Sequence, residues 1–375
     1  MITKSSYEII IIGCGIAGAS LAYFLTERGR RDVLILEKEE QPGYHSTGRA
    51  AGVLAELDFV PSIQKLKLMS AGFLRRPPDG FSEHSILRQS GILVMFQGEL
   101  WELVQQMVPE LRKAGATIDV LSQTEVISRI PVVSSDNFDG ALSLPKDGHL
   151  DVNELLWSYL RHARHRGAQL HLSEGVQGIR VYNGRCSAVI TDKTEYQCRW
   201  IVNAAGAWAG NIRKLIGPSP VQLTPLRRTI ITFKAPEDLD VKDWPFTVDI
   251  NHELYISPES SGLLASPMDE EPMEPCDARP DDRIIAQTIE RLRQLAPRLV
   301  PKSISHKWAG LRTFAPDQAM VVGEDPIVRG FFWLSGQGGS GIETSPVVGQ
   351  IAADLILDGR TELMDVQPMS PARLA

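Results

Sequence analysis

The feature that most constrains the fold is an apolar run that leads into a glycine-rich turn near the N-terminus. Ile9–Ile12 is four consecutive isoleucines, which predicts a strand buried on both faces, as in a parallel sheet. A G-x-G-x-x-G pattern at residues 13–18 follows, and then a helical pattern that ends near Gly29. A second apolar strand at residues 33–36 completes a βαβ unit. The start of the chain therefore predicts an α/β domain.

The turn at residues 13–18 has the glycine spacing of a dinucleotide-binding loop. Gly13 permits the tight turn, Gly15 lets the backbone approach a pyrophosphate, and Gly18 lets the helix pack against the strand. The N–H groups at the helix start would face the phosphates. Glu37, directly after the second strand, can accept hydrogen bonds from both ribose hydroxyls. These features predict a site for either NAD or FAD.

Two further segments help to distinguish these cofactors. Ser46 and Thr47 could bind phosphate and Arg49 could balance its charge, but the same residues also fit a helix N-cap with a solvated arginine. The glycine-rich turn at residues 336–341 would let a flat ring lie against the backbone. A helix predicted at residues 341–358 would direct its positive end at a reduced flavin, which favours FAD.

The other patterns indicate an interrupted domain. Further helices are predicted at residues 61–77, 99–114, 151–166 and 283–295, and strands at 226–266, 303–312, 319–323 and 331–335. Because βαβ signals occur at the start, middle and end of the chain, we expect a discontinuous FAD-binding domain and an inserted substrate-binding domain. The FAD-binding domain would comprise residues 1–60, 145–220 and 305–375, and the substrate-binding domain residues 61–144 and 221–304.

Composition excludes several classes of function. Lys and Arg number 39 against 46 Asp and Glu, so the net charge of −7 gives no support to nucleic-acid binding. The four cysteines are scattered, which indicates neither a zinc site nor a disulfide scaffold, and no metal is expected. No signal peptide or transmembrane stretch is recognised. We expect a cytoplasmic enzyme and leave open peripheral contact with the inner membrane and the oligomeric state.

Several strings, in this order along nearly the whole chain, resemble the FAD-dependent D-amino-acid oxidase (DAO) superfamily, which includes glycine oxidase and sarcosine oxidase. The strings are residues 13–18, Glu37, Ser46–Arg49, Asn203–Trp208, Ala309–Arg312 and 336–344. Gly43–Arg49 and Trp308–Arg312 look most like bacterial D-arginine dehydrogenase and similar D-amino-acid dehydrogenases.

This resemblance implies an α/β fold with a Rossmann-like FAD-binding domain, and an inserted α+β substrate-binding domain built on an antiparallel sheet. It implies FAD held non-covalently, although some relatives attach flavin through Cys or His, so His45 is a candidate for such a link. The implied FAD-binding residues are Gly13, Gly15, Ile16, Ala17, Gly18, Glu37, Lys38, Ser46, Thr47, Arg49, Ala50, Ala51, Gly52, Val176, Ala204, Ala205, Gly206, Trp208, Arg312, Gln337, Gly338, Gly339, Gly341, Ile342, Glu343 and Thr344.

An amino-acid substrate needs a fixed cation for its carboxylate. Arg312 is the leading candidate, because guanidinium binds carboxylate through two parallel hydrogen bonds. The resemblance implies Arg227 as a second cation, but alternation along a strand allows only one of Arg227 and Arg228 to point inward. Tyr255 could donate its hydroxyl to the same carboxylate, or it could be a core aromatic.

Two acidic or titratable residues bear on selectivity and proton transfer. Glu83 matches the position at which D-arginine-type enzymes place an acid for the guanidinium, or it is a solvated loop acid. His45 could assist loss of the amine proton, or it is a loop histidine near the flavin. Val53 and Leu54 replace a loop tyrosine of these relatives, which puts D-arginine specificity in question.

We therefore expect hydride transfer from Cα of a D-amino acid, basic side chains included, to flavin N5. The imino product would hydrolyse to a 2-oxo acid and ammonia. The electron acceptor would be a quinone, another acceptor or O2. The alternatives are a glycine- or sarcosine-type amine oxidase that uses O2, and an FAD-dependent 2-hydroxy acid dehydrogenase.

Overall fold

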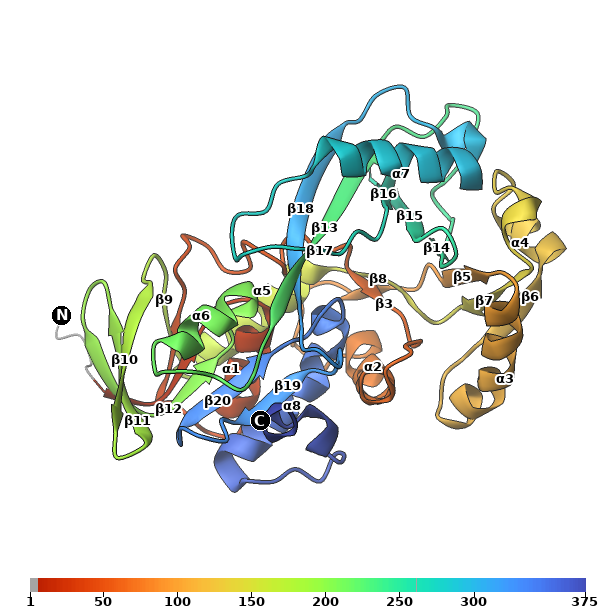
Figure 1. Cartoon of the computed structure of the whole chain (residues 1–375). Helices are drawn as coiled ribbons and strands as arrows, with labels where there is room; N and C mark the ends of the chain where they lie inside the picture. The colour runs from red at the N-terminus through yellow and green to blue at the C-terminus, as the bar shows by residue number, and fades with distance from the viewer. Residues whose placement is uncertain (1–5, 261) are drawn as a thin grey trace.

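Two large sheets organise the chain in the computed structural model, which describes residues 6–260 and 262–375 (Figure 1). The first five residues of the expected FAD-binding domain and residue 261 of the expected substrate-binding domain lie outside the described residues. The architecture is mixed α/β, as the sequence predicts. Within the described residues, no helix combines the length and the apolar character that a membrane crossing requires.

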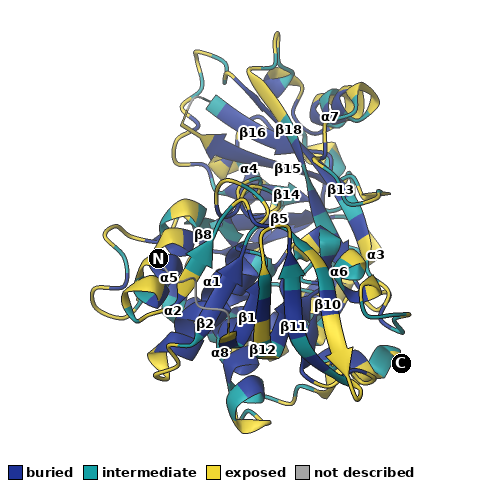
Figure 2. Ribbon diagram, turned by 90° about the vertical axis from the view of Figure 1, so that its left-hand side faces the viewer, coloured by how far each residue is buried: buried dark blue, intermediate teal, exposed yellow. Residues whose placement is uncertain are grey.

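The first sheet has a parallel centre. β12 pairs with β1 and β20, and β2 pairs with β1 and β9, all in parallel, while β10, β11 and β19 add antiparallel strands. Its strands are β1 (Ser6–Ile12), β2 (Val33–Leu36), β9 (Gln169–His171), β10 (Val176–Tyr182), β11 (Arg185–Thr191), β12 (Glu195–Asn203), β19 (Val321–Glu324) and β20 (Phe331–Ser335). The isoleucine run of β1 is buried on both faces, as expected for a central parallel strand (Figure 2).

Helices cover the first sheet. α1 packs on α5 and α8, and α2 packs on α8, around one apolar core, while α6 belongs to a smaller core on the opposite face. The bounds are α1 (Ile16–Glu27), α2 (Pro61–Arg75), α5 (Val152–His165), α6 (Ala209–Lys214) and α8 (Gly341–Asp358). The predicted helices at 61–77, 151–166 and 341–358 are therefore confirmed, each to within two residues at either end.

The second sheet is largely antiparallel. Its order is β17-β13-β16-β15-β14-β5-β7-β6, with β18 paired to β13 and one parallel pair, β14 with β5. The strands are β5 (Ile92–Phe96), β6 (Asp119–Ser122), β7 (Gly140–Leu144), β13 (Thr224–Phe233), β14 (Phe246–Asp249), β15 (Leu254–Glu259), β16 (Gly262–Ser266), β17 (Glu271–Pro272) and β18 (His306–Phe314). The remaining helices are α3 (Glu99–Lys113), α4 (Gln123–Arg129) and α7 (Asp282–Leu295), with short 3-10 turns at Ser135–Asn137, Gly206–Trp208, Pro297–Leu299, Gln367–Met369 and Pro371–Leu374.

A small third sheet joins the two parts. β8 (Gly148–Leu150) pairs with β3 (Val53–Leu54) and with β4 (Leu87–Arg88). The long strands β13 and β18 run side by side between the two parts of the molecule (Figure 1). This arrangement brings β13 and β18 of the second sheet close to the first sheet.

Packing divides the chain differently from the expected domain boundaries in two places. α2, expected in the substrate-binding domain, buries Ile63, Leu66 and Leu74 in the core of the first sheet. β18, expected in the FAD-binding domain, pairs along its length with β13 of the second sheet. In both cases the part of the molecule to which the element belongs depends on contacts between residues far apart in sequence, and the hydrophobic pattern of a short segment does not show such contacts.

A buried ion pair ties α6 to the β19–β20 connection. The Arg213 Nε donates to Asp325 Oδ2 at 2.7 Å, and Asp325 also accepts from the indole N–H of Trp333 at 3.0 Å. Both charged side chains are almost wholly buried. Burial raises the pKa of Asp325, but the hydrogen bonds from Arg213, Trp333 and the backbone lower it overall below its ordinary value.

We predict that Asp325→Asn lowers the free energy of unfolding by about 3 kcal/mol, because it leaves the Arg213 charge buried and unpaired. Since the folded-state pKa of Asp325 is depressed, its contribution is present above the unfolded pKa and is lost as the pH falls. Urea unfolding at neutral and acidic pH measures both effects. Asp282→Asn, which removes an exposed pair with Lys307, is the control and should cost about 1 kcal/mol or less. Equal losses in the two variants would contradict this account.

Candidate functional site

A cavity of about 400 Å³ lies at the carboxyl ends of the parallel strands. Ile12, Leu36, Ala204 and Ser335, at or just after the ends of β1, β2, β12 and β20, line it together with β13 and β18. Ligands of open parallel sheets bind at this edge. Both glycine-rich turns, at residues 13–18 and 336–341, open onto the same cavity, as a single long cofactor requires.

The first turn leaves no room for side chains. Gly13 has a φ of 105°, and a Cβ there would lie 2.5 Å from the Ala204 carbonyl oxygen. A Cβ on Gly18 would lie 2.1 Å from the Gly13 oxygen. The backbone can therefore form the close cradle that a pyrophosphate needs, and Gly18 acts through this packing because it does not itself line the cavity.

Polar groups at the cradle are held ready for a nucleotide. Glu37 accepts hydrogen bonds from the backbone N–H of Cys14 at 2.8 Å and of Glu39 at 3.0 Å, which fixes its carboxylate at the cavity wall. Thr47 Oγ1 accepts from the Ile16 N–H at 3.0 Å, at the start of α1. Residues 41–50 form turns and no helix, so the alternative of a helix N-cap at Ser46 and Thr47 is wrong.

Aromatic and charged side chains close one side of the cavity. The His45 ring lies 4.4 Å from the Trp208 ring, and the Lys38 ammonium lies 3.4 Å from the Trp208 ring centroid. His45 Nε2 lies 2.8 Å from Glu39 Oε1. Burial lowers the pKa of His45, although Glu39 opposes that shift. This histidine faces the cavity as a neutral group with Nε2 already engaged.

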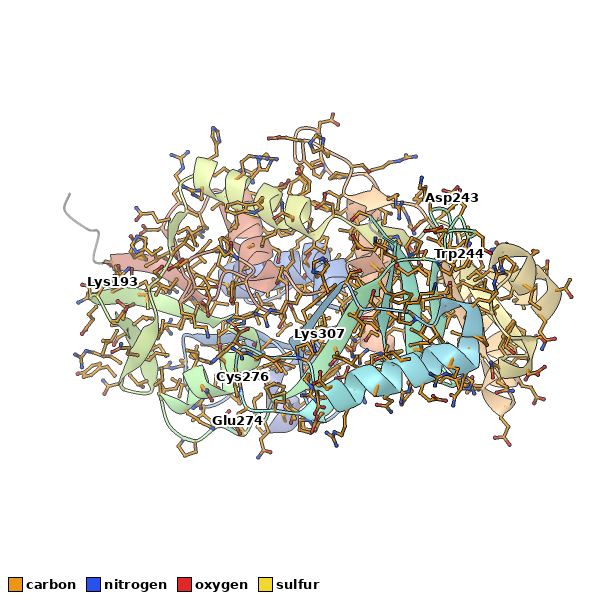
Figure 3. The ribbon with its side chains drawn as sticks, turned by 90° about the horizontal axis from the view of Figure 1, so that it is seen from above. Lys193, Asp243, Trp244, Glu274, Cys276 and Lys307 are labelled. Atoms are coloured by element: carbon orange, nitrogen blue, oxygen red, sulfur yellow. The ribbon has the colours of Figure 1, made fainter. Side chains whose placement is uncertain are left out.

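Arg49 lies at the cavity wall, but its guanidinium does not project freely towards a phosphate. It donates to the Asp277 carboxylate and to the carbonyl oxygens of Ala278 and Ala309. Asp277 belongs to the segment between β17 and α7, on which Figure 3 labels Glu274 and Cys276. Arg49 therefore fastens this segment to β18, and its guanidinium is engaged by protein groups in place of either alternative that the sequence offered, a phosphate or solvent.

The second glycine turn packs directly on the end of β18. A Cβ on Gly339 would lie 2.9 Å from Arg312 Nη1, and a Cβ on Gly338 would lie 2.4 Å from the Phe314 ring. The Nε2 of Gln337 is buried without a hydrogen-bond partner in the described part of the chain. An orphaned donor beside a flat, side-chain-free backbone fits the polar edge of a flavin ring.

Two arginines converge on the cavity from neighbouring strands. The register pairs Arg228 with Gly310 and Leu226 with Arg312, so Arg228 and Arg312 share one face. Arg312 has neither an ion pair nor a hydrogen-bond partner within residues 6–260 and 262–375. Arg228 is 5% exposed and donates to Asp269 and Glu270, but its Nη1 has no partner. Burial and the nearby Arg312 lower the pKa of Arg228 to about 10.

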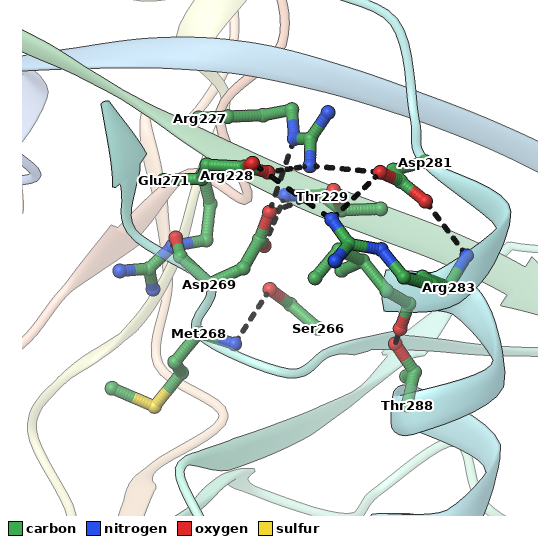
Figure 4. Close-up of polar contacts among 11 residues, drawn as sticks. Arg227, Arg228, Thr229, Ser266, Met268, Asp269, Glu271, Asp281, Arg283 and Thr288 are labelled. Carbon is green, nitrogen blue, oxygen red and sulfur yellow. Dashed lines mark hydrogen bonds and ion pairs between the residues drawn. The ribbon is translucent and has the colours of Figure 1, made fainter. Parts of the chain in front are cut away.

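This register corrects the prediction that Arg227 is the second cation of the site. Arg227 points away from the cavity, into the carboxylates of Asp269, Glu271 and Asp281 (Figure 4). Alternation along β13 gives Arg228, and not Arg227, the inward position. Sequence reasoning recognised that only one of the pair could face inward, and the pairing with β18 determines which.

Two further expected catalytic residues do not line the cavity. Glu83 is 70% exposed at its side chain and pairs with Arg161 at 3.0 Å, so it contacts α5 and not the site. Tyr255 is buried beside the Phe246 ring, and its hydroxyl has no partner among the described residues. Thr344 is also outside the cavity, with Oγ1 bonded to the Ser340 oxygen.

The remaining predicted cofactor residues all line the cavity: Gly13, Gly15, Ile16, Ala17, Glu37, Lys38, Ser46, Thr47, Arg49, Ala50, Ala51, Gly52, Val176, Ala204, Ala205, Gly206, Trp208, Arg312, Gln337, Gly338, Gly339, Gly341, Ile342 and Glu343. Their roles towards a cofactor stay predictions. Sequence reasoning named Arg228 only as the alternative to Arg227, and it missed Ile230 and Glu174; all three line the cavity. Glu174 follows β9 and carries no motif. The sequence shows that Leu226, Arg228 and Ile230 alternate along one strand and therefore share a face. It does not show whether that face or the opposite one lines the cavity.

Comparison with known proteins shows which family the chain resembles. The chain matches the family model DAO, FAD dependent oxidoreductase, over residues 8–355. It is 29% identical to the uncharacterized oxidoreductase YurR of Bacillus subtilis, covering 97% of this chain and 98% of that protein. It is similar to the glycine oxidase structure from Bacillus cereus, with 26% identity, a TM-score of 0.79, and coverage of 95% and 96% of the two chains. An L-proline dehydrogenase from P. horikoshii shares the fold, with 21% identity, a TM-score of 0.87, and coverage of 99% and 98%.

We predict that Gly18→Ala weakens FAD binding about tenfold or more, because the new methyl group would displace the Gly13 carbonyl. Titration of flavin-free protein with FAD, followed by quenching of flavin fluorescence, measures the dissociation constant. Gly72→Ala in α2 is a matched control, since no neighbouring atom lies within 4 Å of the position that its added methyl group would take. Unchanged FAD affinity in the Gly18 variant would refute the assignment of this turn.

Proposed function

Because the chain belongs to the DAO family of FAD-dependent oxidoreductases, we propose that it is a D-amino-acid dehydrogenase that oxidises the CH–NH bond of its substrate. FAD-dependent oxidation of amines or amino acids is the activity of this family. The D configuration rests on the likeness of Gly43–Arg49 and Trp308–Arg312 to D-amino-acid dehydrogenases. The dehydrogenase assignment rests on the same strings.

The single observation that carries the proposal is the pair of cations in the cavity. Arg312 is unpaired among the described residues, and Arg228 has an unsatisfied, buried Nη1. A substrate carboxylate would satisfy both through charge-assisted hydrogen bonds.

The chain's own residues then orient the substrate. Arg312 and Arg228 would fix the carboxylate, and Ala51 and Ile230 would offer apolar surface to the rest of the substrate. Bound FAD supplies the hydride acceptor at N5. Because Nε2 of His45 is engaged by Glu39, Nδ1 is the ring nitrogen that could accept a proton from the amine. The amine would react in its neutral form, and the imino acid released would hydrolyse to a 2-oxo acid and ammonia.

The cavity wall bears on the choice of side chain. Glu83 lies on the surface, so a basic side chain loses the partner that the sequence suggested. Ala51, Val53 and Ile230 offer apolar surface instead. We therefore propose D-amino acids with small or apolar side chains as substrates in preference to D-arginine.

A second candidate is an amine oxidase that uses O2 and acts on glycine or a secondary amine. The similarity to the glycine oxidase structure from Bacillus cereus favours it, and it requires the same arginine pair. Anaerobic mixing of the yellow protein with D-amino acids, L-amino acids, glycine and sarcosine identifies the substrate by loss of flavin absorbance. Reoxidation of the reduced protein by air, compared with a quinone, then separates oxidase from dehydrogenase.

We predict that Arg312→Met and Arg228→Met each raise the substrate dissociation constant by about a hundredfold, since each loses a charge-assisted contact in a buried site. FAD should remain bound in both variants. Anaerobic flavin reduction at increasing substrate concentration measures the constant. Arg283→Met, at an arginine with a 75% exposed side chain, is the control. Wild-type substrate affinity in the Arg312 variant would remove that residue from the site.

A further inference from the structure

α2 carries a lysine that is buried almost completely. Lys67 is 5% exposed, and its ammonium lies 2.9 Å from Asp58 Oδ2, 3.0 Å from Glu343 Oε1 and 3.2 Å from the Leu57 carbonyl oxygen. All three N–H donors therefore have an acceptor. Exposed lysines are the rule on helix surfaces, so a lysine enclosed in this way indicates a specific structural task.

Its partner Glu343 belongs to the cofactor cavity. Glu343 lies in the first turn of α8, lines the cavity and is 5% exposed. Its Oε1 accepts from Lys67, and its Oε2 accepts from the backbone N–H of Ala55 at 2.8 Å. One carboxylate thus joins three elements: α8, α2 and the chain that follows β3.

The wall segment, defined as residues 53–58, is held from α2 by a second set of contacts. The Glu56 N–H donates to Asp147 at 2.6 Å, and Arg75 bridges the carboxylates of Glu56 and Asp147 at 2.8 Å each. Gln64 donates to the Glu56 carbonyl oxygen and accepts from the Asp58 N–H. Every residue from 55 to 58 therefore has a backbone group bonded to another element or to a side chain of α2.

The other side of the wall segment is apolar. Val53 lines the cavity, and Val53, Ala55 and Leu57 pack against the apolar cluster of the second sheet that includes Ile230 and Tyr255. Movement of this segment would break buried ion pairs and hydrogen bonds on one side and apolar contacts on the other. Such a segment behaves as a fixed structure rather than as a mobile loop.

We propose that Lys67 and Glu343 are positioning residues that hold the wall segment fixed against the cavity, so that substrate is enclosed without closure of this segment. The inference rests on the proposed function for the identity of the substrate. The fixed geometry of the wall segment does not depend on the proposed function. The ion pair also fixes the first turn of α8, where Ser70 of α2 donates to the Thr344 carbonyl oxygen.

The charges around Glu343 are consistent with this role. Burial raises the pKa of Glu343, and the Lys67 ammonium opposes that rise. Burial alone would lower the pKa of Lys67, but Glu343 and Asp58 raise it overall. Lys67 is therefore charged at neutral pH, and its removal would leave two carboxylates, Glu343 and Asp58, without a counter-ion.

Hydrogen exchange of the FAD-loaded protein, followed by mass spectrometry of peptides that cover residues 51–60, tests the fixed wall. The wild-type amides of Ala55 and Glu56 should be protected, and substrate should not change their protection. Lys67→Met should accelerate their exchange about tenfold or more, because the Glu343 anchor is lost. Lys65→Met, at an exposed lysine of the same helix, is the matched control and should leave exchange unchanged. Lys67→Arg, which keeps the charge, should retain most of the protection.

Kinetics on the same variants test the consequence for the reaction. Lys67→Met should raise KM about tenfold with a smaller change in kcat, because a loosened wall weakens substrate binding more than the chemical step. If Lys67→Met fails to fold, Glu343→Gln keeps the side-chain size, removes the ion pair and should accelerate exchange at Ala55 in the same way.

Three results would overturn the inference: equal exchange in the Lys67 and Lys65 variants, fast exchange of these amides in the wild type, or protection that appears only when substrate binds. These outcomes are separable from failure of the proposed function. A wild-type protein that binds FAD but is bleached by no amino acid would refute the substrate, while the exchange data would still decide whether the wall is fixed.

Discussion

The parallel alignment of β2, β1 and β12 is the constraint from which the site follows. It brings the Gly13 N–H to the Leu36 carbonyl oxygen at 2.8 Å and the Ala204 N–H to the Ile12 carbonyl oxygen at 2.9 Å. Three segments distant in sequence therefore end at one place. Since no side chain fits at Gly13, their backbones form a continuous surface that opens onto the cavity.

The second sheet completes the cavity through two long strands. β13 and β18 extend from that sheet towards the first, and their register sets Arg228 and Arg312 on the same face. The glycine turn before α8 packs flat on Arg312, so the cofactor surface and the substrate cations are built against each other. A shift of β13 by one residue against β18 would turn Arg228 away from the face that carries Arg312.

The charge balance inside the cavity follows from which groups are already paired. Glu37 is engaged by backbone N–H groups, Glu343 by Lys67, and Arg49 by Asp277. Arg228 and Arg312 are left with donors that no described residue satisfies, so the region near the second sheet attracts an anion. The wall segment is tied to α2 and α8 by the same kind of pairing, because Lys67 contacts Asp58 and Glu343 while Arg75 contacts Glu56.

Sequence by itself determined the features whose cause is local. The strand of isoleucines, both glycine turns, Glu37 and the helices at 61–75 and 341–358 follow from burial periodicity and from backbone freedom, which are properties of short segments. Only the tertiary structure decided which arginine of β13 faces inward, because strand register depends on a partner about 80 residues away. Only the tertiary structure shows that Glu83 lies on the surface and that Lys67 pairs with Glu343. Contacts between distant segments leave no pattern in the sequence of either segment.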